Sequence, residues 1–158
     1  MDNKYMENKY KVLVTAPYLQ PYVEKYRAIF TSHQIETIVP PVKERLSEEE
    51  LLEYIGKFHP HLVCLSILDA TMKIVNTIFS SVKKSYPEII TVCGGVHASM
   101  YPQETLEGNI DIDYLAYGEA ELTIKELVAA LEAKSDLHSV VGIYFRENGE
   151  VIFTGYRP

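Results

Sequence analysis

The sequence contains no tryptophan, and only two of its 158 residues are cysteines. Two thiols, Cys64 and Cys93, are too few for a disulfide scaffold, an iron–sulfur cluster or a four-cysteine zinc site. Both cysteines lie inside apolar runs that are typical of strands. We therefore expect buried, reduced thiols in a cytoplasmic protein.

Positive charge is also scarce, because 15 basic residues face 22 acidic ones and the formal net charge is −7. An acidic surface repels phosphate groups, which disfavours nucleic acids and anionic membranes as partners. No apolar run approaches the roughly 18–20 residues that cross a bilayer, and the N-terminus lacks the apolar stretch of a secretory signal. We expect neither a nucleic-acid partner nor a membrane.

The length and a hydrophobic content of 47% are those of one ordinary domain with a real core. Residues 1–10 repeat a near-identical unit, DNKYM and then ENKYK, without an apolar face. They predict a disordered tail before a single domain over residues 11–158.

Within that domain, short apolar runs alternate with segments of helical periodicity. The predicted strands are residues 11–16, 36–40, 61–67, 88–93 and 113–117. Ser47 and Glu50 form a capping-box signature, and Asn148-Gly149 predicts a type I′ turn between residues 141–146 and 150–154.

Strict alternation of strands and helices favours a parallel sheet that is covered on both faces. The predicted fold class is α/β: a flavodoxin-like (Rossmann-like) three-layer sandwich with a five-stranded parallel sheet and a C-terminal β-hairpin. In such a fold the loops that leave the first, third and fourth strands meet at the carboxyl edge of the sheet, where ligands bind.

Several common ligands of this fold do not suit these loops. After the first strand, Pro17 and Pro21 remove two N–H donors that a flavin phosphate would need. The clustered carboxylates and the lysine of a phospho-receiver are absent, and neither a GxGxxG turn nor a GxxxxGK[ST] loop occurs. Flavin mononucleotide, phosphoryl transfer and dinucleotides are therefore disfavoured.

Small residues mark two other strand ends, where Ser66-Ile67-Leu68 closes the third strand and Gly94-Gly95 closes the fourth. If these strands are neighbours, a hydroxyl lies beside backbone without side chains, on which a flat aromatic group can rest. The alternative is structural: the glycines make a tight turn and Ser66 caps the following helix.

These residues also carry a resemblance. Ser66-x-Leu68 followed by Gly94-Gly95 is similar to the SxL…GG half of the cobalamin-binding signature. Residues 94–106, 113–131 and 141–154 resemble the N-terminal cobalamin-binding domains of cobalamin-dependent radical SAM enzymes, a likeness that covers about residues 60–158. The first half, in contrast, resembles the N-terminal domain of D-2-hydroxyacid dehydrogenases, which is also flavodoxin-like.

The resemblance implies cobalamin with its dimethylbenzimidazole tail between the strands. Ser66 would hydrogen-bond the tail, Leu68 would pack on it, and Gly94 and Gly95 would form the floor of the slot. The other cofactor-binding residues that it implies lie at the corrin rim or tail entrance (Val96, His97 and Ala98), below the corrin (Tyr18, Leu19 or Gln20) and in the turn beyond the fifth strand (Gly118 and Glu119).

Two departures from the family pattern qualify this expectation. The loop of residues 16–22 has no histidine, so cobalt is expected to lack a histidine ligand, and His97 is expected to form a hydrogen bond at the rim or to the backbone instead. No CxxxCxxC occurs, so this chain has no ligands for an iron–sulfur cluster. The domain alone is then not catalytic, and its partner would be a radical SAM catalytic domain in cis or in trans.

Two further hypotheses stay open. One is a flavodoxin-like interaction or scaffold domain, chimeric or engineered, without a cofactor, in which Tyr18, Met100 or Tyr101 fills the pocket. The other is an independent enzyme that uses acid–base groups from His97, Asp113, Glu119 and Glu121. The cobalamin hypothesis predicts that Gly95→Leu blocks uptake without unfolding the domain.

Overall fold

The computed structural model describes residues 10–14, 20–32, 35–38 and 47–157. The chain divides into two compact units, one of residues 1–64 and 81–90 and the other of residues 65–80 and 91–158. The predicted tail lies outside the described residues except for Tyr10, which begins the first strand. A single domain over residues 11–158 stays a prediction.

The first unit contains parallel strands and helices in alternation. Its elements are β1 (Tyr10–Val14), α1 (Gln20–Ser32), β2 (Ile35–Ile38), α2 (Glu48–Phe58) and the first part of β3 (Leu62–Ser66). Strand β1 pairs in parallel with both neighbours, Tyr10 opposite Ile35 of β2 and Val12 opposite Leu62 of β3. The order within this unit is therefore β2-β1-β3.

Helix α2 begins as its sequence predicts. The Ser47 hydroxyl accepts a hydrogen bond from the Glu50 N–H at 3.2 Å, and the Glu50 carboxylate accepts one from the Ser47 N–H at 2.8 Å. This capping box satisfies two backbone donors that a helix start leaves unpaired. Leu51 and Ile55 of the same helix are buried, as the helical periodicity indicates.

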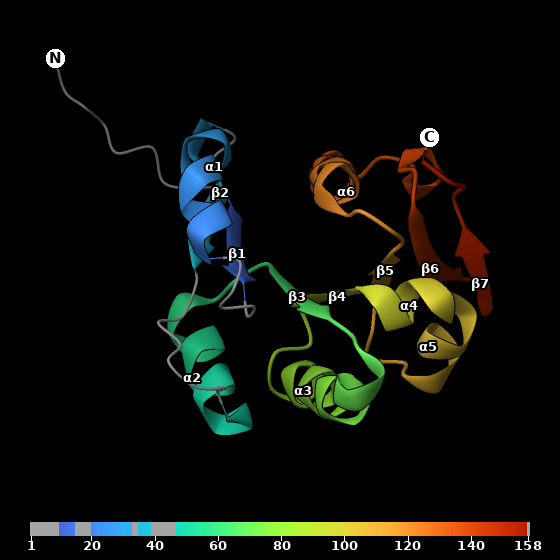
Figure 1. Ribbon diagram of the computed structural model, residues 1–158, viewed down its shortest axis with the longest axis horizontal. Coiled ribbons are helices and arrows are strands. Elements are labelled where there is room, and N and C mark those ends of the chain that lie inside the picture. Colours follow the sequence, from blue (N-terminus) through green and yellow to red (C-terminus); the bar gives the residue numbers. More distant parts are fainter. Residues whose placement is uncertain (1–9, 15–19, 33–34, 39–46, 158) are drawn as a thin grey trace, which may run out of the picture. The chain divides into compact units, whose positions relative to one another are not determined.

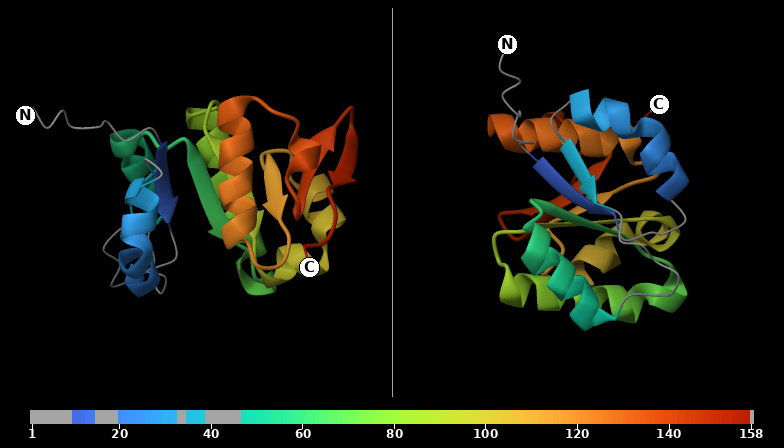
Figure 2. Two further views of the ribbon diagram at one scale, coloured as in Figure 1. Left: turned by 90° about the horizontal axis from the view of Figure 1, so that it is seen from above. Right: turned by 90° about the vertical axis from the view of Figure 1, so that its left-hand side faces the viewer.

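The second unit holds the end of β3 and the later elements, except for residues 81–85 and Ile90, which belong to the first unit. The later elements are η2 (Asp69–Thr71), α3 (Met72–Ser85), β4 (Ile90–Gly94), α4 (Val96–Met100), α5 (Pro102–Gly108), β5 (Tyr114–Ala116), α6 (Glu121–Ala133), η3 (Leu137–Ser139), β6 (Ile143–Glu147) and β7 (Glu150–Phe153). In Figures 1 and 2, α6 lies on one side of the strands of this unit, with α3 and α5 on the other. Fully buried apolar side chains from both layers, such as Phe79 and Leu127, form the core.

The sheet of this unit is mixed, in the order β3-β4-β5-β6-β7. Strand β5 is parallel to β4, but β6 runs antiparallel to β5, with Ile143 opposite Ala116. Asn148 (φ +54°) and Gly149 (φ +85°) turn the chain from β6 into β7, as the type I′ prediction requires. The predicted α/β fold is confirmed. The sheet, however, is only partly parallel, because β6 pairs with the free edge of β5 and the hairpin thereby extends the sheet.

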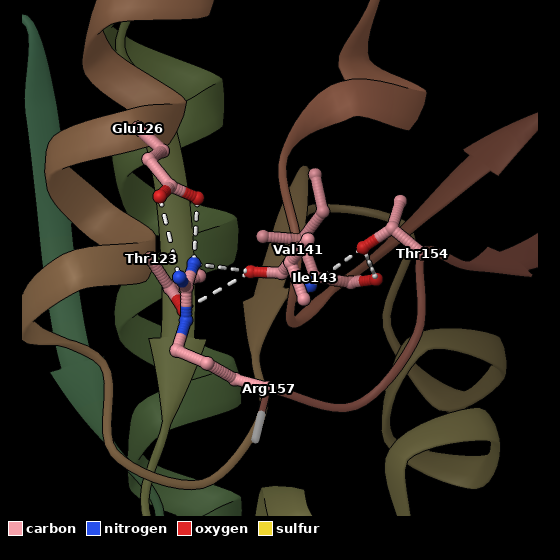
Figure 3. A network of polar contacts seen from close by, with 6 residues as sticks. All are labelled: Thr123, Glu126, Val141, Ile143, Thr154 and Arg157. Carbon is pink, nitrogen blue, oxygen red and sulfur yellow. Dashed lines mark hydrogen bonds and ion pairs between the residues drawn. The ribbon is translucent and has the colours of Figure 1, made fainter.

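The C-terminal segment is attached to α6 by one ion pair (Figure 3). The Arg157 guanidinium donates to both Glu126 carboxylate oxygens, at 3.2 and 2.6 Å, and to the Val141 carbonyl at 2.9 Å. The hydrogen bond from Arg157 lowers the pKa of the Glu126 carboxyl. Thr123 of α6 donates to the same Val141 carbonyl at 3.2 Å, so helix, hairpin entry and C-terminal segment share one polar network.

A second arginine, Arg146 of β6, joins the hairpin to the end of α5. Its guanidinium donates to the carbonyls of Ile112 and Asn109, both at 2.7 Å, and to that of Leu106. Carbonyls at a helix C-terminus lack partners within the helix and favour a nearby positive charge. Arg146 therefore holds the connection between α5 and β5 in place.

We expect Arg146→Met to lower the free energy of unfolding by about 1.5–3 kcal/mol, the range for hydrogen bonds to charged groups. Urea unfolding followed by circular dichroism measures the change. The matched control is Arg27→Met, which removes an exposed pair with Glu24 one helical turn away and is expected to cost at most about 0.5 kcal/mol. Equal losses in the two variants would show that the carbonyl contacts of Arg146 add no stability.

Among the described residues, no helix combines the length and the apolar character that a membrane span needs.

Candidate functional site

The ends of β3 and β4 lie directly side by side in the second unit. The Ile67 N–H donates to the Gly94 carbonyl at 2.8 Å, and the His97 N–H donates to the Ile67 carbonyl at 3.1 Å. The structure thus brings together the Ser66–Leu68 and Gly94–Gly95 segments that the sequence analysis singled out. Both segments stand at the carboxyl ends of their strands, where an α/β sheet binds ligands.

Gly95 is required by the backbone itself. Its φ is +92°, and an added Cβ would overlap the Ser66 hydroxyl oxygen and lie 3.1 Å from both the nitrogen and the carbonyl oxygen of Ile67. Side chains rarely adopt this conformation, and a Cβ at this approach would force its neighbours to shift. The backbone thus gives Gly95 a structural reason to be glycine, and we expect Gly95→Leu to destabilise the domain, whereas the role of Gly95 in the cofactor slot stays a prediction.

Gly94 is different, because the local fold does not exclude a side chain there. An added Cβ would lie 3.4 Å from the Ala116 carbonyl oxygen and 4.0 Å from the Ala116 Cβ, which are ordinary contacts. Neither the backbone conformation nor these neighbours among the described residues demand a glycine. The missing side chain leaves room at the end of β4, beside β5.

Ser66 offers a hydroxyl group that the described residues do not use. Its side chain is exposed, its oxygen faces Gly95, and it makes no hydrogen bond with any described residue. The 3-10 turn that follows begins after Leu68, whose N–H donates to the Thr71 hydroxyl at 3.0 Å. Within the part of the chain that the structure describes, Ser66 is not a helix cap, so its hydroxyl stays available to a ligand.

Exposed apolar side chains occur on the segments that follow β3, β4 and β5. They are Leu68, Val96, Met100, Tyr101 and Leu122, each at least 43% exposed. Large apolar side chains that gather on a surface mark a binding site more often than isolated ones do. This edge is suited to an apolar ligand with a few polar groups.

Ala98 does not belong to this surface. It is fully buried, whereas Val96 and Met100 on the same short helix are each 62% exposed. Residues four apart share one face of a helix, and Ala98 lies between them in sequence and therefore points the other way. The predicted place of Ala98 at the corrin rim or tail entrance has no support from this burial and stays a prediction.

His97 is held by a residue that the sequence analysis did not select. Its side chain is 13% exposed, and Nδ1 contacts the carboxylate of Asp69, which is itself 82% exposed. The Tyr101 ring lies 5.2 Å from the imidazole, centroid to centroid. His97 and Asp69 are far apart in sequence, and no spacing rule could have paired them.

The turn beyond β5 contains Gly118 and Glu119, both exposed. The Gly118 N–H donates to the Ser99 hydroxyl at 3.0 Å, so α4 and this turn are joined at the same edge. Ser99 is a second residue that the sequence analysis missed. Of the residues predicted to lie below the corrin, Tyr18 and Leu19 lie outside the described residues, and Gln20 is the first residue of α1.

The acid–base hypothesis receives little support. The Asp113 carboxylate accepts hydrogen bonds from the Thr91 N–H at 2.8 Å and the Thr91 hydroxyl at 3.1 Å, at the amino ends of β4 and β5. Asp113 therefore lies at the opposite edge from His97 and Glu119. Among the described residues, no group of three or more histidine, cysteine or acidic side chains could hold a metal ion.

The two cysteines are not suited to nucleophilic chemistry. Cys93 is buried and Cys64 half buried, and neither forms a disulfide. Burial raises the pKa of the Cys64 thiol to about 12, so at neutral pH it is almost entirely in the unreactive thiol form.

An α/β unit with an open strand end, an available hydroxyl and exposed apolar side chains at its carboxyl edge is a Rossmann-like ligand-binding domain. Residues 23–128 match the model of the B12 binding domain family. The chain belongs to this family.

Relatives of known sequence include two methyltransferases, one of which is cobalamin-dependent. An uncharacterized methyltransferase of Pyrococcus horikoshii, PH0819, is 32% identical over 121 residues, which are 77% of this chain and 26% of that protein. The cobalamin-dependent radical SAM methyltransferase TokK of Streptomyces tokunonensis is 27% identical over 150 residues, 92% of this chain and 21% of TokK. The chain thus spans about a quarter of the length of these relatives.

Solved structures share the fold at low identity. The radical S-adenosylmethionine methyltransferase TsrM of Kitasatospora setae aligns with a TM-score of 0.72 and 16% identity, over 93% of this chain and 30% of TsrM. The cobalamin-dependent radical enzyme OxsB with aqua-cobalamin and S-adenosylmethionine bound aligns with a TM-score of 0.70 and 18% identity, over 94% of this chain and 22% of OxsB.

Proposed function

We propose that the chain binds cobalamin as a module of a radical SAM methyltransferase or cyclase. Its fold would be the flavodoxin-like, three-layer sandwich that the alternation of strands and helices predicts. One observation carries the proposal: at the paired ends of β3 and β4, the unused hydroxyl of Ser66 lies against Gly95, and the preceding residue, Gly94, lacks a side chain that the fold would tolerate. A planar nucleobase with a ring nitrogen needs such a gap and such a hydroxyl.

The residues at this edge fit the parts of cobalamin in different ways. Ser66 would donate to the nitrogen of the dimethylbenzimidazole tail, and Leu68, 52% exposed, would pack on its ring. Gly94 would leave room for the tail, while Gly95 would hold the two loops together from below. When bound, the cofactor supplies the reactivity of cobalt toward methyl groups and radicals, and the protein supplies binding and orientation.

The corrin ring would lie above the rest of this edge. Val96, Gly118 and Glu119 are exposed there, and Tyr18, Leu19 or Gln20 would approach from the loop after β1. We retain the prediction that cobalt receives no histidine ligand from this chain, because the loop of residues 16–22, where the family pattern places that ligand, has no histidine.

The chemistry would belong to a partner. The chain has no CxxxCxxC for an iron–sulfur cluster, so a radical SAM catalytic domain in cis or in trans would act on the bound cofactor, in the cytoplasm. The alternative of a cofactor-free scaffold requires bulky side chains that fill the site, but Met100 and Tyr101 are 62% and 43% exposed. Tyr18, the third residue named for that role, lies outside the described residues.

Loading with hydroxocobalamin tests the proposal. The full chain is mixed with an excess of the cofactor under oxidising and under reducing conditions and is then desalted. We expect the corrin absorbance to elute with the protein at a ratio that approaches one cobalamin per chain. If no corrin absorbance accompanies the folded protein under either condition, the chain is not a cobalamin carrier.

A further inference from the structure

His97 is the one predicted rim residue whose side chain the structure engages in a specific polar contact. Its imidazole is 13% exposed and touches the Asp69 carboxylate through Nδ1, while the Tyr101 ring packs at 5.2 Å. The backbone around it is fixed as well, because the His97 N–H donates to Ile67 at 3.1 Å and the His97 carbonyl accepts from Tyr101 at 2.9 Å. Ring and backbone are therefore held in one orientation.

The contact with Asp69 determines where the imidazole proton resides. An ionised carboxylate can only accept hydrogen bonds, so Nδ1 must carry the proton and donate it to Asp69. A neutral imidazole then has an unprotonated Nε2, which is an acceptor. Nε2 has no hydrogen-bond partner among the residues that the structure describes.

Both residues of this pair lie on the loops of the proposed cofactor edge. His97 stands two residues after Gly95, and Asp69 directly follows Leu68, so the pair connects the two loops of the slot. Cobalamin carries primary carboxamide side chains around its corrin ring, and each of these has N–H donors.

We propose that Asp69 is a positioning residue that keeps His97 in the Nδ1–H tautomer, so that Nε2 accepts a hydrogen bond from a corrin carboxamide. This inference rests on the proposed cobalamin binding and adds the polar recognition of the corrin rim. Without Asp69, an imidazole that protonates Nε2 instead would set a donor against the donor of the carboxamide, and the contact would be lost.

The tautomer itself can be measured before any cofactor is added. Nitrogen-15 spectra of the histidine side chains at a pH where His97 is neutral distinguish a protonated from an unprotonated Nε2. We expect the Nδ1–H form of His97 in the wild type, its partial loss in Asp69→Ala, and a shift of the Nε2 resonance when cobalamin binds. An Nε2–H form of His97 in the unliganded wild type would overturn the proposal.

Measurements of cobalamin affinity test the second part of the proposal, the hydrogen bond between Nε2 of His97 and the corrin. Because each variant removes one neutral hydrogen bond, Asp69→Ala and His97→Phe are each expected to weaken cobalamin binding about two- to twelvefold. In the His97→Phe background, Asp69→Ala should weaken it no further, since Asp69 acts through His97. The matched control is Glu147→Ala, which removes the carboxylate from another pair, 3.2 Å from Nε2 of His138, and should leave affinity unchanged.

The outcomes separate this inference from the proposed function. A wild-type chain that retains no cobalamin refutes both. A wild type that binds cobalamin, together with Asp69→Ala and His97→Phe variants that bind it equally well, refutes only the role of the pair. Thermal melting of each variant by circular dichroism ensures that affinities are compared between folded proteins.

Discussion

The Gly94→Val variant is expected to bind cobalamin roughly 5- to 150-fold more weakly than the wild type, because forcing extra methyl groups into a filled site costs about 1–3 kcal/mol. In the free protein the Cβ of that side chain meets no such obstacle. Its Cβ would lie 3.4 Å from the Ala116 carbonyl oxygen, in ordinary contact, and valine suits a strand. The melting temperature should therefore change by no more than about 2 °C.

Equilibrium titration with hydroxocobalamin and thermal melting measure the two effects. The matched control is Gly108→Val at the end of α5, where an added Cβ meets nothing within 4 Å. That variant should keep both its cobalamin affinity and its melting temperature. If Gly94→Val binds cobalamin as tightly as the wild type does, the space at Gly94 does not receive the cofactor, and the proposed function loses its main support.

Most elements of the fold follow from local patterns in the sequence. The capping box at Ser47, the helical spacing of Leu51 and Ile55 and the Asn148-Gly149 turn are each encoded within a few residues, and the structure confirms all three. The mixed sheet could not be predicted in this way. The pairing of Ile143 with Ala116 joins residues from different parts of the chain, and nothing in either segment specifies the direction of the other.

The candidate site, too, could be predicted only where it depends on local sequence. Residue types and spacing were enough to select Ser66, Leu68 and the two glycines, since small residues at strand ends are visible in the sequence. They could not distinguish Gly94 from Gly95, because only the approach of Ile67 and the φ of +92° show which glycine the backbone requires.

Contacts between segments explain the remaining differences. The pairing of Asp69 with His97, and that of Ser99 with the Gly118 N–H, depend on how α4 folds onto its neighbours. Ala98 was selected by its place in the motif, but the phase of α4 turns it into the core. A motif identifies which segment lies at a site, whereas the side-chain directions within the segment depend on the helix that it forms.

The second large effect is expected for Gly95→Ala, which should lower the free energy of unfolding by about 2–6 kcal/mol. Two costs contribute to this loss. A side chain at φ +92° is strained by about 1–3 kcal/mol, and its Cβ, 3.1 Å from the backbone nitrogen and oxygen of Ile67, adds an overpacking cost of about 1–3 kcal/mol. For a chain of this length, each kcal/mol lowers the melting temperature by about 2–4 °C.

A second glycine separates the two costs. Gly155 has a φ of +100°, but an added Cβ there meets nothing within 4 Å, so Gly155→Ala carries the strain without the overlap. We expect Gly95→Ala to be less stable than Gly155→Ala by about 1–3 kcal/mol in urea unfolding. Equal stability of the two variants would mean that the β3 and β4 loops separate at little cost to admit a methyl group. In that case Gly95 could not hold them at a fixed spacing for a nucleobase, and the slot would have to form around the ligand.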